Sequence, residues 1–417
     1  MAFPHYSVKR YVSLSVSLQP FKEKNFSWLW AGAFLSSMGF WVQAVGQSWQ
    51  VLQLTNSALL LGLVTFAATL PNIIFSPLGG VVADRFDRRH LLIGTQTIYM
   101  TTATLLGILT TLHIIAVWQI FLVALINGTF NSAGQPAWQA FIGDLVRQEQ
   151  LKQGIALNSV QFNLSRVIGP ALGGISIGLF GIAGSYYLNA LSYVAVLIPL
   201  ILMRPGHKQY TNRQQSMWRS LREGLTYVKR RPTLQIILLL QFTIAFLVFP
   251  YSTLLPIFAR DIFHIGAPGL GLLNVASGMG ALTGAILLML LSQRQERGRP
   301  FLLALCVVAG LASIAFALSH ILDVSLLILM VLGSCTVMSG IVTNGTLQIL
   351  TPVEMRGRVL SIWIMVAFGL GPFGNLLAGW VAQSFGARLT LALGGSLCAT
   401  VALLIVCLKK ERKSESE

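Results

Sequence analysis

The fold of this chain is decided by the stretch Gly79-Gly80-Val81-Val82-Ala83-Asp84-Arg85-Phe86-Asp87-Arg88-Arg89-His90-Leu91-Leu92. This stretch places six ionisable residues between two apolar runs, 58–82 and 91–109. Each run is long enough to cross a bilayer as a helix of about 20 residues. The charged stretch between them is therefore predicted to be a tight loop at the membrane surface.

The residue types in this loop limit what it can do. The two glycines that open it let the end of one helix pack closely against a neighbour. Asp84 is predicted to accept hydrogen bonds from the free N–H groups at a helix start. Arg85, Arg88 and Arg89 offer guanidinium groups to carboxylates or lipid phosphates. A basic loop after a membrane helix is also an ordinary topology signal, so both interpretations stay open.

The composition is that of a membrane protein. Hydrophobic residues make up 54% of the chain and charged residues 10%, far from a soluble globular domain. The formal net charge of +16 would suit nucleic acid, but the cations lie in the short gaps between apolar runs. We therefore predict an integral membrane protein whose cations face anionic lipids, with no nucleic acid as a partner.

Counting the apolar runs predicts an all-α membrane protein with twelve transmembrane helices. The positive-inside rule tests this count, because a missed span would scramble the alternation of loops. With the N-terminus in the cytoplasm, every lysine and arginine except Arg166, Arg260 and Arg388 falls on the cytoplasmic side. Both termini are therefore predicted to be cytoplasmic. The predicted spans are 26–53, 58–82, 91–111, 114–137, 154–180, 184–203, 233–258, 266–292, 299–319, 324–350, 359–385 and 387–408.

A long basic segment divides these spans into six and six. Within it, residues 217–228 place apolar side chains at helical spacing among cations, which predicts a helix lying in the cytoplasmic membrane interface. A solvated linker is the alternative. The chain is thus predicted to have an N-terminal cytoplasmic arm (1–25), a six-helix bundle (26–203), a basic linker (204–232), a second six-helix bundle (233–408) and a cytoplasmic tail (409–417).

The two halves of the sequence repeat each other at several positions. An offset of 209 residues aligns Leu61-Gly62 with Leu270-Gly271. A later offset of 205 residues aligns Gly169 with Gly374 and Gly174 with Gly379. These matches support two similar six-helix halves.

Several amide side chains fall within predicted spans, where contact with lipid would be costly. Such groups are predicted either to line a substrate path or to form hydrogen bonds between helices. The candidates are Gln43, Gln47, Asn127, Asn131, Gln161, Asn344 and Gln348.

Arg166 is the cation that lies deepest in a predicted span. At about 1.5 Å per residue it lies roughly 18 Å beyond Gly154, near the middle of a core about 30 Å thick. None of the thirteen acidic residues falls in a predicted hydrocarbon stretch. Its donors must then meet helix carbonyls, water in a cavity, an acidic substrate, or the amides of Asn127, Asn131 or Asn163. Arg166 is predicted to be either structural or part of the substrate path, where it would favour an anion.

Two motifs give the chain a family resemblance. The order Gly-x-x-x-Asp-Arg-x-x-Arg-Arg, from Gly80 to Arg89, resembles the loop signature between helices 2 and 3 of the major facilitator superfamily, which usually has glycine at Asp87. In the fifth span, Gly-Pro-x-x-Gly-Gly at 169–174 is similar to the signature of exporting facilitators. With the segments 163–170 and 135–137, it resembles the branch that holds macrolide efflux proteins and the enterobactin exporter.

This resemblance implies a fold and roles for particular residues. Two six-helix halves would stand in parallel repeat, with a substrate path between them near mid-membrane. By position, Asp84, Arg85 and Arg88 would belong to a cytoplasmic gate, with Asp144 as a possible partner of an arginine. A packing hinge would consist of Gly169, Pro170, Gly173 and Gly174.

The resemblance also implies a function, namely export of a small amphipathic organic compound across a bacterial inner membrane by alternating access. The compound would be a drug, a siderophore or another secondary metabolite. Antiport against protons is the family expectation, and the sequence has no Gly-rich phosphate loop ending in Lys-Ser/Thr. The coupling site stays open between a loop acid, Asp84 or Asp144, and anion exchange at Arg166. An importer or metal carrier, and a non-transporting sensor or scaffold, are the alternatives.

No enzyme activity, cofactor or metal site is predicted. The four cysteines lie inside apolar runs without metal-ligand or disulfide spacing, so they are predicted to be packing residues. The six histidines lie in loops, termini or span ends. The protein is predicted to act as a monomer.

Overall fold

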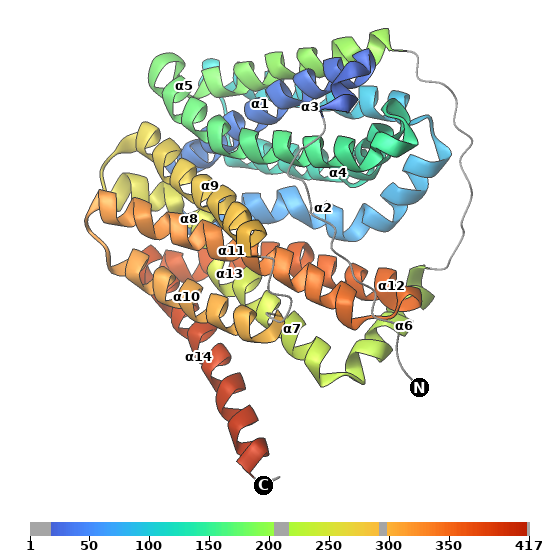
Figure 1. Cartoon of the computed structure of the whole chain (residues 1–417). Helices are drawn as coiled ribbons and strands as arrows, with labels where there is room; N and C mark the ends of the chain where they lie inside the picture. The colour runs from blue at the N-terminus through green and yellow to red at the C-terminus, as the bar shows by residue number, and fades with distance from the viewer. Residues whose placement is uncertain (1–17, 204–216, 292–297, 415–417) are drawn as a thin grey trace.

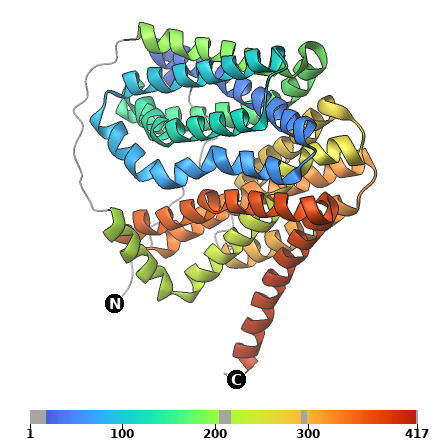
Figure 2. The same ribbon diagram turned by 180° about the vertical axis from the view of Figure 1, so that it is seen from behind.

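The computed structural model describes residues 18–203, 217–291 and 298–414, without the side chains of 76–81, 83–85, 217–221, 291 and 407–414. The described residues are mostly helical and include no strand. Figures 1 and 2 show two helical bundles side by side, one built from α1 to α5 and the other from α7 to α14. The all-α fold predicted from the sequence is confirmed.

The first bundle consists of long helices, one of which is bent back on itself. Gly181 breaks α5 into two arms at φ 69°, a backbone region that favours glycine. Both arms lie beside the start of α1, since Trp30 donates to Leu157 O at 3.0 Å and Phe26 shares a buried cluster with Leu200. α5 thus contains two predicted spans. The elements are η1 (Gln19–Lys22), α1 (Lys24–Thr55), α2 (Ala58–Arg85), α3 (Arg88–Thr111), α4 (Val117–Leu145), η2 (Gln148–Gln150) and α5 (Leu151–Leu202).

The second bundle follows a short helix, α6, within the basic linker. Glu223 of α6 forms an ion pair with Arg358 of α12 at 2.9 Å, so α6 packs against the second bundle. The elements are α6 (Met217–Lys229), α7 (Pro232–Thr243), η3 (Ile244–Val248), α8 (Tyr251–Ile257), η4 (Phe258–Ile262), α9 (Gly266–Leu291), α10 (Gly298–Leu318), α11 (Leu322–Leu350), α12 (Val353–Ile364), η5 (Met365–Gly369), α13 (Gly371–Phe385) and α14 (Ala387–Ser414).

Wide π turns interrupt two spans that the sequence predicts as continuous helices. In η3 and η5 the backbone N–H groups of Phe249 and Leu370 donate five residues back, at 2.9 and 3.1 Å. Pro250 and Pro372 follow these turns closely. A proline has no N–H, and in an α-helix its ring clashes with the carbonyl four residues earlier. The wider turn accommodates each proline and is the physical reason for the interruption.

The number of described spans differs from the predicted number for two reasons. α5 is bent into two arms, and α1 and α4 are less apolar than the other long helices. Nine of the described helical segments have the length and apolarity of a membrane span, and the two arms of α5 count among them as one. α1 and α4 are long enough, with 32 and 29 residues, but are not among the nine. Twelve crossings stay a prediction, which would require both arms of α5, α1 and α4 to be counted as separate spans. Exposed apolar side chains, such as Leu179 at 70% and Leu191 at 67%, suit contact with lipid.

The two bundles meet through two pairs of glycines. A Cβ added at Gly271 of α9 would lie 2.7 Å from Pro170 O and 3.0 Å from Gly174 Cα of α5. A Cβ added at Gly379 of α13 would lie 2.6 Å from a carbonyl oxygen of α2 and 3.2 Å from Gly62 Cα. Backbones this close leave no room for a side chain.

The internal repeat exchanges these two contacts. Under the repeat, α2 corresponds to α9 and the first arm of α5 corresponds to α13. Gly169 and Gly374 form a third equivalent pair. A Cβ added at Gly169 would lie 2.5 Å from Trp41 Cβ of α1, and a Cβ added at Gly374 would lie 2.5 Å from Phe246 O of η3. The halves are therefore pseudo-symmetric in their contacts. The equivalent positions are Gly62 and Gly271, Gly174 and Gly379, and Gly169 and Gly374.

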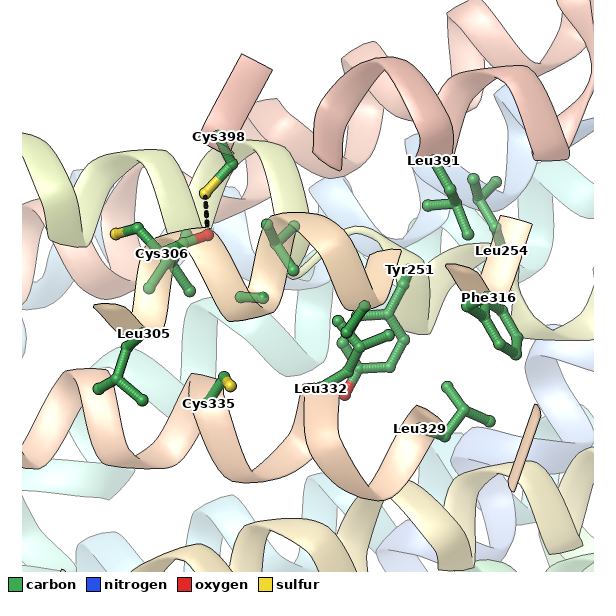
Figure 3. Packing of buried hydrophobic residues seen from close by; sticks show 14 of the residues in the cluster. Tyr251, Leu254, Leu305, Cys306, Phe316, Leu329, Leu332, Cys335, Leu391 and Cys398 are labelled. Carbon is green, nitrogen blue, oxygen red and sulfur yellow. Dashed lines mark hydrogen bonds between the residues drawn. The ribbon is translucent and has the colours of Figure 1, made fainter. Parts of the chain in front are cut away.

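The second bundle has a continuous apolar core, part of which is drawn in Figure 3. Cys306, Cys335 and Cys398 lie in it as free, buried thiols. Cys398 Sγ donates to Cys306 O at 3.5 Å, so these residues pack helices and form no disulfide. The side chain of Cys407 lies outside the described residues.

We predict that Gly271→Ala lowers the free energy of unfolding by about 1–3 kcal/mol, because the new methyl group must displace the α5 backbone. Thermal unfolding of the purified protein in detergent measures this. Gly94→Ala is the matched control, since a Cβ at this helical position meets nothing within 4 Å. The control should be neutral or stabilising by up to about 1 kcal/mol. Equal melting temperatures for the two variants would contradict the close contact.

Candidate functional site

The first arm of α5 presents two packing faces. Gly169 and Gly173 face α1, because a Cβ added at each would lie 2.5 and 3.1 Å from side-chain atoms of α1. Pro170 and Gly174 face α9 and meet Gly271. The four residues predicted as a hinge therefore divide between a contact inside the first bundle and the contact between bundles.

Gln161 lies on the face of α5 that meets α1. Its side chain is 2% exposed, and its amide nitrogen donates to Ala33 O at 2.9 Å and Ser37 Oγ at 2.7 Å. One turn further, Ser165 donates to Phe34 O at 3.3 Å. Gln161 thus joins α5 to α1.

Gln43 and Gln47 belong to a polar network inside the first bundle. Gln43 Nε2 donates to Gln47 Oε1 at 3.4 Å, and Asn189 Nδ2 donates to Gln43 Oε1 at 2.6 Å. Gln43 is buried and Gln47 is half-buried. Asn189, on the second arm of α5, is missing from the sequence-based candidates, although an asparagine inside an apolar span is the signal that would find it.

The remaining amide candidates also occur in hydrogen-bonded pairs. Asn127 of α4 accepts from a threonine of α3 at 3.0 Å, and Asn131 donates to Asn72 of α2 at 3.3 Å. On α11, Gln348 donates to Asn344 Oδ1 at 2.5 Å, and Gln348 is exposed. The pairs of α4 connect helices, whereas the pair of α11 lies along one helix.

Arg166 is half-buried on α5 where that helix meets α9. Its carbonyl oxygen would lie 3.1 Å from a Cβ added at Gly278. The amides expected as its partners bond elsewhere, because Asn163 donates to Ser159 O at 2.8 Å and those of α4 form the pairs above. Among the described residues, the guanidinium has no hydrogen-bond or ion-pair partner. Of the alternatives predicted for the donors of Arg166, the asparagine amides are therefore not its partners in this structure.

The loop between α2 and α3 is held by two arginines of the signature. Arg88 Nη1 lies 2.9 Å from Asp144 Oδ2, and the two side chains are only 16% and 10% exposed. Arg89 donates to Leu200 O at 2.5 Å and Ile201 O at 2.6 Å, in the last turn of α5. Arg88 thus joins α3 to α4, and Arg89 joins α3 to α5.

The N-cap position of α3 is not Asp84, because α2 runs on through Arg85. Asp87 is the N-cap of α3 and accepts from the His90 N–H at 3.0 Å. Aspartate is among the best N-cap residues, which explains a turn that differs from the glycine form. Partial burial acts to raise the pKa of Asp87, but the hydrogen bonds and charge of His90 outweigh it and lower that pKa. The side chains of Asp84 and Arg85 lie outside the described residues.

Arg260 connects the two bundles at the opposite end of the molecule. Its guanidinium donates to Leu52 O at 3.1 Å and Asn56 Oδ1 at 2.5 Å, and it pairs with Asp261 at 2.6 Å. We call this end the Asn56 end, and the end that holds the α2–α3 loop the Asp87 end. The glycine pairs lie toward the Asn56 end, because Gly62 and Gly271 lie in the second turns of α2 and α9.

A cavity of about 870 Å³ opens beside the Asn56 end, between α1, α3 and the bend of α5. Its lining mixes polar groups such as Gln50 and Tyr187 with apolar ones such as Phe180 and Leu191. None of the residues predicted for the substrate path lines it. In the part of the chain that the structure describes, no group of three His, Cys, Asp or Glu side chains could hold a metal ion.

The sequence is similar to those of known transporters. At 26% identity over 93% of this chain and 98% of the relative, the sequence is similar to the staphyloferrin A transporter of Staphylococcus aureus. It is 24% identical to macrolide efflux protein A of Streptococcus pyogenes, over 93% of this chain and 97% of the relative.

Solved structures share the fold at low sequence identity. A bacterial homologue of the human lysosomal transporter Spinster, in an inward-facing and occupied conformation, has a TM-score of 0.74 at 13% identity, covering 92% of this chain and 97% of that one. The nucleoside transporter NupG has a TM-score of 0.70 at 14% identity, covering 93% and 99%. The family described as transmembrane secretion effector matches residues 15–417. The chain therefore belongs to the transmembrane secretion effector family of the major facilitator superfamily, a family of multi-pass membrane transporters.

Proposed function

We propose that this protein exports a small amphipathic organic compound out of the cytoplasm by alternating access, as a monomer. The observation that carries this proposal is that two pseudo-symmetric bundles meet at two glycine contacts, which the internal repeat relates to each other. Such contacts consist of backbone against backbone, so the bundles can separate there without breaking side-chain hydrogen bonds. Two bundles that rock about this contact would expose a site between them to each side in turn.

The described contacts favour a state that is closed at the Asn56 end. There Arg260 bonds to α1 across the two bundles, beside the glycine pairs. At the Asp87 end, the ion pair Arg88–Asp144 lies within the first bundle. The ion pair Arg358–Glu223 joins α12 of the second bundle to α6. With the basic loops in the cytoplasm, as the positive-inside rule favours, this arrangement corresponds to an inward-facing state.

The relatives support export and a broad substrate class. Their names include a staphyloferrin A transporter, a macrolide efflux protein and the multidrug efflux pump Tap. These names join a siderophore, macrolides and mixed drugs, so we propose a drug, a siderophore or another secondary metabolite as the substrate here. The substrate path would include Gln43, Gln47, Asn127, Asn131, Arg166, Asn344 and Gln348, with Gln161 as a support that ties α5 to α1.

Export against a gradient needs an energy source, and we propose proton antiport. Asp144 is the described acid best placed to couple proton binding to motion, because it pairs with Arg88 at the proposed cytoplasmic gate. Protonation of Asp144 would break this pair and weaken the contact between α3 and α4 at the Asp87 end. An importer of the same fold would instead raise the amount of substrate inside the cell, which the first experiment below distinguishes.

Cells that express the protein should accumulate less of an exported compound than cells without it, and a protonophore should remove the difference. The test measures accumulation of macrolides, siderophores and acidic, neutral and basic dyes. Gly94→Ala, at equal expression, should retain the wild-type effect. Higher accumulation in expressing cells would indicate import, and no difference for any compound would contradict export.

The proposed orientation predicts which end reacts with an impermeant reagent. In a variant whose native cysteines are replaced by alanine, Leu112→Cys lies at the Asn56 end and Phe86→Cys at the Asp87 end. These native side chains are similarly exposed, at 59% and 61%. A membrane-impermeant maleimide added to intact cells should label the cysteine at 112 and spare the one at 86. The reverse pattern would show that the molecule is inserted the other way.

A double-mutant cycle tests the proposed gate. Arg88→Ala and Asp144→Ala should each cost about 3 kcal/mol of unfolding free energy, because each leaves a largely buried partner charge. Their coupling energy should be about 1–3 kcal/mol. The exposed pair Arg147–Glu23, 74% and 34% exposed, is the control and should couple by less than about 1 kcal/mol. Equal coupling in the two cycles would argue against a special role for Arg88 and Asp144.

A further inference from the structure

A cation of one bundle and a hydroxyl pair of the other lie together at the contact between α5 and α9. The carbonyl oxygen of Arg166 approaches the backbone of Gly278, at 3.1 Å from an added Cβ. The residue before Gly278 is Ser277, whose hydroxyl lies 2.6 Å from the hydroxyl of Tyr251. Arg166 and Ser277 therefore lie at the same contact between α5 and α9, and Tyr251 is bonded to Ser277 there.

The hydroxyl pair is held in place by packing. Tyr251 is 1% exposed and Ser277 is 7% exposed. Figure 3 shows the Tyr251 ring in the apolar core of the second bundle, near Leu332. Because the ring cannot move without disturbing this core, the hydroxyl pair has a fixed position relative to α9.

Arg166 differs from the other arginines of the spans and their ends. Arg88, Arg89, Arg260 and Arg388 each bond to an acid, a carbonyl or a histidine. For the Arg166 guanidinium the structure gives no such bond among the described residues. A guanidinium has five N–H donors and stays charged in proteins, and an intramembrane charge without a counter-charge is costly. The site therefore lacks one negative group.

We propose that Arg166, supported by the Tyr251–Ser277 hydroxyl pair, is a subsite for the carboxylate of the exported compound, so that the substrates are amphipathic organic acids. This inference rests on the proposed function. A guanidinium binds a carboxylate through two parallel hydrogen bonds, which a neutral group cannot replace. An acid held here would lie at the meeting point of α5 and α9, one from each bundle. Its binding would then bias how the bundles sit relative to each other.

Direct binding tests the subsite without transport. The thermal unfolding of the full-length protein in detergent is measured with naphthoate and with its neutral amide, naphthamide. Naphthoate should raise the melting temperature of the wild type more than naphthamide does. Arg166→Gln should remove this difference, with at least about tenfold weaker naphthoate binding. Arg166→Lys should keep part of the difference, because it keeps the charge and loses the planar fork.

Lys152→Gln is the matched control, because it removes an exposed cation from the same helix and should leave the naphthoate shift unchanged. Tyr251→Phe should reduce the preference for naphthoate over naphthamide without changing the naphthamide shift, which a loss of packing alone would not do. Equal shifts for acid and amide in the wild type, no shift with naphthoate, or an intact preference in Arg166→Gln would overturn the subsite.

A transport assay separates failure of the subsite from failure of export. Cells are loaded with a xanthene dye that bears a free carboxylate, or with its methyl ester. Arg166→Gln should slow efflux of the acid at least about tenfold more than efflux of the ester. If naphthoate binds through Arg166 while expression changes the accumulation of no compound, the subsite stands and the proposed export is wrong. Equal slowing of both dyes would overturn the preference for acids.

Discussion

The approach of backbone to backbone at two pairs of glycines is the constraint on which the arrangement of the bundles depends. At Gly174 with Gly271 and at Gly62 with Gly379, no side chain separates the helices. Since lipid offers little hydrophobic drive for helices to associate, small residues that permit close packing decide which helices meet. These four glycines therefore place α5 against α9 and α2 against α13, and they bring Arg166 to the same seam.

Much of this could be predicted from the sequence, for simple physical reasons. A backbone in lipid must satisfy its own hydrogen bonds, so apolar runs of sufficient length have to be helices. The alternation of basic gaps then constrains the number of crossings. The offsets that relate Gly62 to Gly271 and Gly174 to Gly379 also have a physical meaning, because the repeat carries each contact onto the other.

The partners of individual side chains were harder to predict. Asp84 and Asp87 are both aspartates near a helix start, and only the end point of α2 decides which one caps α3. The amides of Asn127 and Asn131 suit Arg166 in type and depth, yet they point to α3 and α2. Asn189 and Tyr251 form hydrogen bonds with Gln43 and Ser277, which lie on elements distant from them in the sequence. Such pairings depend on helix rotation, which periodicity alone leaves open.

The π turns of the second bundle make the twin halves unequal in stiffness. α1 runs as one α-helix from Lys24 to Thr55, whereas its counterpart is broken into α7, η3, α8 and η4. The α13 side is likewise broken at η5, ahead of Pro372, while the first arm of α5 stays helical through Pro170. Because π turns are wider than α-helical turns, we expect the C-terminal half to bend during the conformational change. The N-terminal half should move as a rigid body. The two halves would then contribute unequally to the conformational change, despite their similar fold.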